Sequence, residues 1–181
     1  MKKLLIALLI VLPFTIFAQN RTKVAPPKKK EVKTFPFDST TMKITYHDVI
    51  SLPERSKERI YNRLKTFTTD PKDIIKDDQA NGIFTYKARY SVKYPSPMIG
   101  IMHSGTVNYE VTFKYKDNEY EFTVTNFIHK GQQGDGGELE NKKPACDQYL
   151  LSPQGWGAIK NQALAQNEAL VKSIIATIRI P

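Results

Sequence analysis

The sequence contains only one cysteine, Cys146, among 181 residues. A lone cysteine cannot form an intramolecular disulfide, so the thiol is either free or used in a bond to another molecule. Stability must therefore come from a buried core, which a chain of this length can build. Cys146 also has no neighbouring base in the sequence, and a catalytic thiol needs one. We expect neither a disulfide-stapled domain nor a cysteine enzyme.

Histidine is almost as scarce as cysteine, with only His47, His103 and His129 in the chain. No two of them have the spacing of paired metal ligands. No serine lies in a nucleophile elbow, and the glycine-rich stretch 131–137 lacks the lysine and the strand–helix context of a phosphate-binding loop. These absences predict a non-enzymatic protein with no catalytic residues, no metal and no cofactor.

Long hydrophobic runs are absent except at the N-terminus. Lys2 and Lys3 precede an unbroken apolar stretch, 4–12, and the small residue Ala18 follows. This layout is typical of a secretory signal peptide, which we assign to 1–18. The apolar stretch is too short to span a bilayer comfortably. We therefore expect an exported protein, periplasmic or extracellular, with no stable membrane insertion after cleavage.

The formal net charge of +9 is concentrated next to this N-terminal segment. Residues 20–36 carry six Lys or Arg against the single acid Glu31. The segment contains proline and few aromatic residues, so it cannot bury enough surface to fold. We interpret 19–36 as a disordered linker, either a plain spacer or a tether to an acidic surface, and 37–181 as one folded domain.

Alternation of apolar and polar residues predicts strands, and spacing of three and four predicts helices. Met42, Ile44 and Tyr46 are expected to face the core from the first strand. Ser51 and Ser56 are alternative N-cap candidates for the helix that follows. The predicted order is strand 42–50, helix 56–67, short strand 73–78, turn at Asn81-Gly82 and strand 83–94.

A hairpin over 104–130 has a register that many side chains support together. With a two-residue turn at Asp117-Asn118, apolar residues oppose apolar ones and lysines oppose glutamates. The same register puts Asn126 on the apolar face opposite Tyr109. The expected pairs are Tyr115–Tyr120, Phe113–Phe122, Val111–Val124, Val107–Ile128, Lys116–Glu119, Lys114–Glu121 and Thr112–Thr123.

The last part of the chain is expected to be a mobile loop over 130–155 followed by a helix. An apolar stripe from Ala163 to Ile178 marks this helix, with Asn167 as a polar interruption. Both predicted helices have one apolar stripe, so both must cover the same apolar face of the sheet. The predicted class is α+β, a five-stranded antiparallel sheet with both helices on one face.

The stretches SKERIYNRLKTF, DDQANGIFTYKARY and GTVNYEVTFKYKDNEYEFTVTNF carry a resemblance to a known family. In this order they resemble one repeat of the TATA-box-binding-protein (TBP) fold. More closely, roughly residues 40–130 are similar to an uncharacterised family of exported Bacteroidota proteins, a domain of unknown function with a TBP-like fold. The resemblance implies the order β-α-β-β-β-β-α and supplies no active site.

The residues argue against DNA as the partner that this fold suggests. A minor-groove saddle needs a cationic face with paired apolar wedges. Here the polar sheet face mixes lysines with glutamates, and Phe127 is its only wedge. The basic side of helix 56–67 is expected to be a solvated face, with its apolar stripe on the sheet. We expect no specific nucleic-acid binding.

The uncovered polar face of the sheet is the candidate site for binding an envelope protein or a glycan. His47 is expected near Glu119 on this face, and His129 near Lys43 at its far end. The candidate face comprises Lys43, Thr45, His47, Lys87, Arg89, Lys93, Thr112, Lys114, Glu121, Thr123 and Phe127.

Two further predictions remain open. The many tyrosines and phenylalanines on the apolar face either fill the core or surround a small apolar ligand between the sheet and the terminal helix. Asp38-Ser39-Thr40 matches a short O-glycosylation pattern, which makes Ser39 a candidate acceptor. The oligomeric state is not indicated by the sequence.

Overall fold

The structure is a computed structural model that describes residues 34–68 and 70–179, which belong to one compact unit. The expected signal peptide, 1–18, and nearly all of the expected linker, 19–36, lie outside the described residues. At the end of that linker, Phe35 packs against the core and the Pro36 carbonyl accepts a hydrogen bond from the Thr45 N–H.

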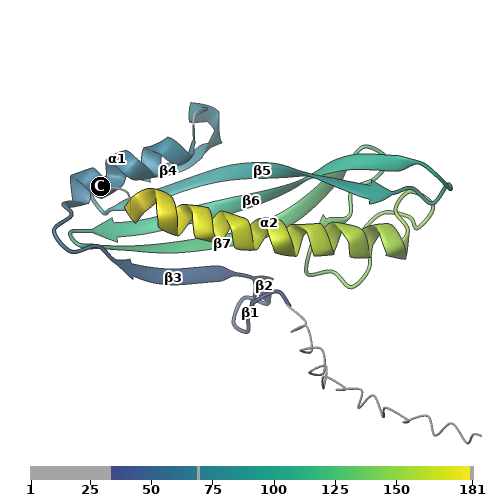
Figure 1. The fold of residues 1–181 in the computed structure, drawn as a ribbon, viewed down its shortest axis with the longest axis horizontal. Coiled ribbons are helices and arrows are strands. Elements are labelled where there is room, and N and C mark those ends of the chain that lie inside the picture. Colours follow the sequence, from purple (N-terminus) through teal and green to yellow (C-terminus); the bar gives the residue numbers. More distant parts are fainter. Residues whose placement is uncertain (1–33, 69, 180–181) are drawn as a thin grey trace, which may run out of the picture. The chain divides into compact units, whose positions relative to one another are not determined.

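Eight strands and two α-helices make up the described residues (Figure 1). The strands are β1 (Phe37–Asp38), β2 (Lys43–Ile44), β3 (Tyr46–Ser51), β4 (Ile74–Asp78), β5 (Ile83–Pro95), β6 (Met102–Lys116), β7 (Glu119–Gly131) and β8 (Gly137–Glu138). The helices are α1 (Lys57–Leu64) and α2 (Pro153–Arg179), and two 3₁₀ turns are η1 (Lys65–Phe67) and η2 (Pro71–Asp73).

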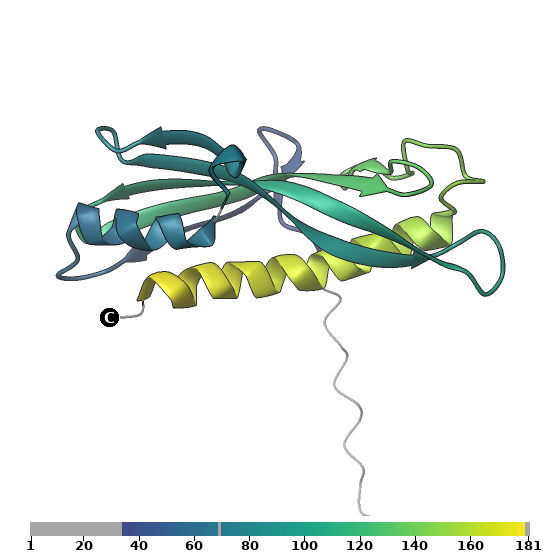
Figure 2. The ribbon, with the colours of Figure 1, turned by 90° about the horizontal axis from the view of Figure 1, so that it is seen from above.

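The main sheet is antiparallel, with strand order β3-β7-β6-β5-β4, and β8 pairs with β7 as a sixth strand. Figure 2 shows both helices on one side of this sheet. The predicted α+β class and helix placement are therefore confirmed, but the sheet has six strands instead of five. The extra strand was missed because Gly137 and Glu138 are too short a stretch to show alternation.

The strand expected over 42–50 is broken into two. Lys43–Ile44 pairs with Phe37–Asp38 in a separate small sheet, and Tyr46–Ser51 joins the main sheet beside β7. Met42 lies in the turn of the small hairpin with φ of +56° and is 68% exposed. The prediction that Met42 faces the core is therefore wrong, because its strand has not yet begun.

The hairpin of β6 and β7 has the predicted turn and the predicted pairs up to Val111–Val124. Beyond that point a bulge shifts the register, so Val107 opposes His129 instead of Ile128. Asn126 supplies the extra residue, with φ of +57°. Its amide donates to Glu110 Oε2 at 2.7 Å, so it does not lie on the apolar face opposite Tyr109.

The bulge reverses the facing of every later residue in β7, because side chains alternate along a strand. Phe127 and His129 were both expected on the polar face, and both are fully buried in the core. Neither prediction is correct. His129 accordingly does not lie beside Lys43 on an open surface, and the proposed wedge Phe127 packs edge-on against Tyr46 with ring centroids 6.0 Å apart.

Helix α1 is an amphipathic helix on the sheet, as predicted. Ser56 is the N-cap, and its hydroxyl accepts a hydrogen bond from the Arg59 N–H at 3.3 Å. Ile60, Tyr61 and Leu64 are buried beneath it. Each buried aliphatic side chain contributes about 1.5–3 kcal/mol, which accounts for the docking of this short helix.

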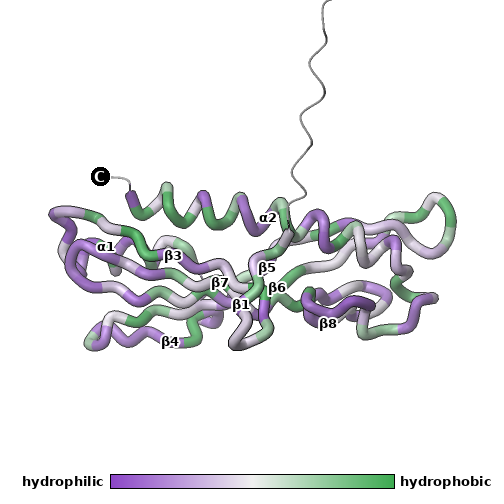
Figure 3. Tube along the Cα trace, turned by 90° about the horizontal axis from the view of Figure 1, so that it is seen from below, coloured by the Kyte–Doolittle hydropathy of each residue, from purple (hydrophilic) through white to green (hydrophobic). Residues whose placement is uncertain are grey.

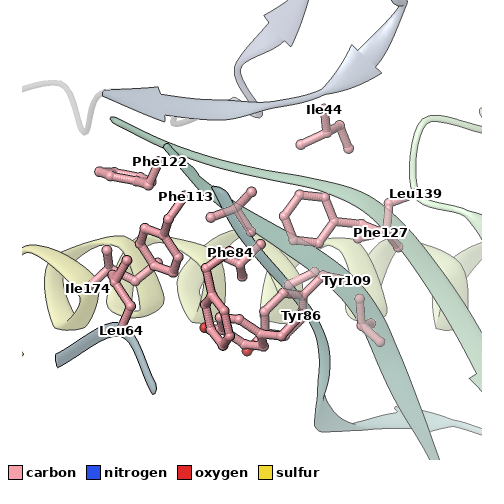
Figure 4. Close-up of a cluster of buried hydrophobic side chains, with 14 of the residues drawn as sticks. Ile44, Leu64, Phe84, Tyr86, Tyr109, Phe113, Phe122, Phe127, Leu139 and Ile174 are labelled. Carbon is pink, nitrogen blue, oxygen red and sulfur yellow. The ribbon is translucent and has the colours of Figure 1, made fainter. Parts of the chain in front are cut away.

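Helix α2 begins ahead of its predicted apolar stripe and closes the core. Trp156 and Ile159 extend the buried side toward the N-terminus of the helix. Asn167, the polar interruption, accepts a hydrogen bond from the Tyr90 hydroxyl at 2.8 Å. Figure 4 shows some of the buried side chains that meet here, among them Leu64, Phe84, Tyr86, Phe113, Phe122 and Ile174.

The segment expected as a mobile loop, 130–155, is packed against the domain. Leu139 and Leu151 are buried in the core. The Leu139 N–H donates to the Phe127 carbonyl at 3.0 Å, and the Ala145 N–H donates to the Gly136 carbonyl at 2.9 Å. This segment and β8 therefore continue the sheet past the bulge.

Candidate functional site

The polar face of the sheet is formed by alternate residues of β3, β5, β6 and the first half of β7. Along β5, the side chains of Lys87, Arg89 and Lys93 are exposed while Tyr86 and Val92 point to the core and are buried. Figure 3 shows hydrophilic and hydrophobic positions interleaved along the strands of the sheet. This alternation brings most of the predicted face residues to one side.

The part of this face over β3 and β7 is neutralised by ion pairs. Glu121 lies 3.1 Å from Lys114 Nζ and 3.3 Å from His47 Nε2. The hydrogen bonds from Lys114 and His47 hold the pKa of the Glu121 carboxyl below its usual range. Lys116 pairs with Glu119 at 2.9 Å. His47 thus lies on the predicted face, but its partner is Glu121 instead of Glu119.

Three further residues of the predicted face also have partners. Lys43 pairs with Glu138 of β8. The Thr45 hydroxyl lies 3.3 Å from that of Thr125, and the Thr112 hydroxyl lies 3.2 Å from that of Thr85. Thr123 stands opposite Thr112 and His47 in the sheet. These interactions join neighbouring strands, so the side chains that make them are less available to a ligand.

The part of the face over β5 is different, because its cations have no acidic partner in the described part of the chain. Glu110 is the residue opposite Lys87, but its carboxylate is held by Asn126 across the bulge. The residues opposite Arg89 and Lys93 are neutral, an asparagine and a serine. We call Lys87, Arg89 and Lys93 the β5 cations.

Two hollows lie along this part of the face. One, of about 490 Å³, is lined by Asp70, Asp73, Lys87, Ala88, Arg89 and Asn108. The other, of about 380 Å³, is lined by Ser91, Ser104, Gly105, Thr106, Lys130, Gly131 and Gln132. Sequence reasoning missed these small polar residues, although their alternation along β5 and β6 already placed several of them on this face.

The buried His129 lies outside the polar face, among aromatic rings and backbone groups. Its Nδ1 accepts a hydrogen bond from the Gly136 N–H at 3.1 Å, while its Nε2 has no partner among the described residues. The rings of Tyr94 and Trp156 pack edge-on against it. Burial lowers the pKa of His129, which favours the neutral ring.

The described residues contain neither an activated thiol nor a metal-binding cluster. Burial raises the pKa of the Cys146 thiol, which is the opposite of what a nucleophile requires. The described part of the chain contains no group of three or more residues that could hold a metal ion. None of its helices combines the length and hydrophobicity needed to cross a membrane.

The candidate modification site Ser39 lies in the turn of the small hairpin and is exposed. The neighbouring Asp38 carboxylate accepts hydrogen bonds from the Thr40 N–H and the Thr41 hydroxyl, each at 2.8 Å. These bonds fix the turn and leave the Ser39 side chain accessible. Glycosylation of Ser39 remains a prediction.

An exposed aliphatic loop joins β5 to β6. Met98, Ile99, Ile101 and Met102 are all exposed, with Ile99 wholly so. The sequence indicated only a chain break here, because the proline-containing stretch has no periodicity. This loop is at the end of the sheet, apart from the hollow at Lys87 and Arg89.

Part of this chain is similar to a known family. Residues 46–130 match the sequence model of a domain of unknown function (DUF4468) with a TBP-like fold. The match covers somewhat less than half of the chain. No match was found among curated proteins.

Two crystal structures are similar to the chain as a whole. One is a DUF4468 family protein from Bacteroides ovatus, with 14% identity and a TM-score of 0.59 over 83% of this chain and 93% of that one. The other is a TBP-like protein from Parabacteroides distasonis, with 14% identity and a TM-score of 0.57 over 80% of this chain and 97% of that one. At this identity the likeness establishes the fold alone.

Proposed function

We propose that this domain is a non-enzymatic module that binds an acidic protein of the cell envelope through the polar face of its sheet. The observation that carries the proposal is the contrast between the two parts of that face. Beside β7 the lysines of β6 are paired, whereas the β5 cations form no ion pair among the described residues. Two of them, Lys87 and Arg89, line a hollow whose other side carries Asp70 and Asp73. Unpaired cations at a surface attract an anionic partner.

The envelope as location rests on the predicted signal peptide, 1–18, which lies outside the described residues. The remainder of the face is near neutral, which disfavours strong binding to bulk polyanions. This charge distribution is consistent with an exported protein as the partner. The competing idea of an apolar ligand between sheet and α2 gains no support, because the rings there contact one another. Tyr90, which bonds to Asn167 of α2, packs against Tyr109 with ring centroids 5.7 Å apart, and Tyr109 packs against Phe127 at 6.0 Å.

The test is a pull-down from an envelope extract with the mature protein as bait. Replacement of Lys87, Arg89 and Lys93 by Glu should reduce recovery of the bound partner by at least about tenfold, since each rim charge contributes modestly and three are reversed. The melting temperature should stay near that of the wild type, because exposed charges contribute little to stability.

A charge-matched control separates this effect from net charge. Arg59, Lys142 and Lys172 are exposed and lie outside the β5 cations. Their replacement by Glu changes the net charge equally and should leave recovery of the partner intact. Equal loss with both triple variants, or no loss with either, would show that the polar face is not the interface.

A further inference from the structure

The outer edge of β5 is only half covered by another strand. Strand β4 pairs with β5 from Ile83 to Tyr86 and goes no further. On the opposite side of the sheet, the outer edge of β7 is covered by β3 and then, past the bulge, by β8. Beyond Tyr86 no second strand pairs with β5 in the described part of the chain, although the 3₁₀ turn η2 lies beside Lys87 and Arg89.

Along an antiparallel strand, successive residues direct their backbone N–H and C=O groups to alternate sides. The Tyr115 N–H donates to the carbonyl of Gly82, which immediately precedes β5, so the even-numbered residues of β5 hydrogen-bond to β6. The odd-numbered residues therefore direct their backbone groups to the outer edge. At Lys93 the N–H donates to the side chain of Gln162 in α2, and the carbonyl accepts from the same side chain. The outward N–H and C=O groups of Arg89 and Ser91 have no partner among the described residues.

The apolar side chains next to this open edge are less completely buried than those next to β4. Phe84 and Tyr86, where β4 is present, are 0% and 2% exposed. Ala88 and Tyr90, just past the end of β4, are only partly buried, and further along β5 Val92 and Tyr94 are buried again. An added strand would cover their apolar surface on one side and lie beside the β5 cations on the other.

We propose that an extended acidic segment of the partner protein binds by adding a strand to β5 between Lys87 and Lys93. Its backbone hydrogen-bonds to Arg89 and Ser91, as in other cases of strand addition at a sheet edge. Alternate side chains then contact different surfaces: carboxylates meet the β5 cations, and apolar side chains cover Ala88 and Tyr90. This inference rests on the proposed function and specifies its partner as an alternating acidic and apolar strand.

A second copy of the chain is a poor occupant of the same edge. Antiparallel pairing of two β5 strands around Arg89 would place the two Arg89 side chains opposite each other, and pairing around Ser91 would place Arg89 opposite Lys93 of the other copy. Like charges directly opposite in a sheet are destabilising. The charge on this edge therefore disfavours self-association and favours an acidic strand.

The experiment uses the full mature chain and a capped synthetic peptide of alternating Glu and Val. Hydrogen exchange followed by NMR should show fast exchange at the Arg89 and Ser91 amides alone and at least about tenfold slower exchange with saturating peptide. The same peptide with N-methylated backbone amides keeps its side chains but cannot pair, so it should not bind. Binding without protection of these two amides would overturn the inference.

A backbone variant distinguishes this inference from the proposed function. Ser91→Pro removes the outward N–H of Ser91 without touching a cation, and proline is tolerated where a strand N–H faces outward. It should weaken peptide binding and partner recovery at least about tenfold, with an unchanged melting temperature. If Ser91→Pro binds like the wild type while the triple Glu variant does not, strand addition is wrong and side-chain binding at the face stands. If neither variant loses binding, both proposals fail.

Discussion

His129 and Asn126 are the two residues whose environment differs most from what the sequence indicated. Alternation alone assigned both positions in β7, and an alternating pattern contains no sign of an inserted residue. Asn126 tolerates a positive φ better than most residues, and its side chain secures the bulge by bonding to Glu110. The cue for the bulge was an Asn followed by Phe on what would otherwise be the polar face.

The buried His129 predicts a pH dependence of stability. Burial lowers its pKa in the folded state below the ordinary value of 6.5. In the window below pH 6.5, the unfolded chain therefore binds a proton that the folded chain does not. Stability due to this group is fully present above that value and is lost as the pH falls through the folded pKa.

Denaturant unfolding between pH 7.5 and 5 would measure this loss. His129→Asn retains an acceptor for the Gly136 N–H but cannot titrate, so its stability should change less over this range than that of the wild type. A wild-type slope in the His129 variant would contradict the account.

At the scale of elements, the sequence predicted best where independent patterns agreed. The turn at Asp117-Asn118 was correct because apolar, charged and threonine pairs all supported one register. The prediction of helix α1 was correct because its apolar stripe and its N-cap residue, Ser56, indicate the same helix. The strand β8 and the first turns of α2 were missed because they are defined by contacts with distant residues, such as Leu139 with Phe127, which no local pattern reveals.

Strand β7 offers the sharpest prediction at this scale. Asn126→Val should disfavour the positive φ of the bulge, and a strand that straightened over the same number of residues would turn Phe127 and His129 to the polar face. Loss of one buried phenylalanine alone costs about 3–5 kcal/mol, so we expect a large drop in melting temperature or loss of cooperative unfolding.

The matched control is Asn126→Gly, which tolerates the positive φ and loses only the bond to Glu110. It should cost about 1 kcal/mol, measured by the same thermal unfolding. A valine variant as stable as the glycine variant would mean that the bulge does not set the facing of β7.

At the scale of the whole molecule, fold and site were predictable to different degrees. The α+β class and the position of both helices follow from hydrophobic patterns alone. The candidate face was only partly predictable, because composition does not reveal which cations are paired. Lys114 and Lys87 look alike in the sequence, yet Lys114 is bound to Glu121 while the acid opposite Lys87 is held by Asn126.

The central claim is that the polar face of the sheet, and not the helical side, contacts a partner. Site-specific photo-crosslinking in cells that produce the protein tests this most directly. A photoreactive amino acid at Thr112, in the middle of the face, keeps all three β5 cations in place. The same group at Gln166, exposed on α2, is the matched control. We predict a defined covalent adduct from position 112 and none from position 166. An adduct from α2 alone, or equal labelling from both positions, would contradict the account.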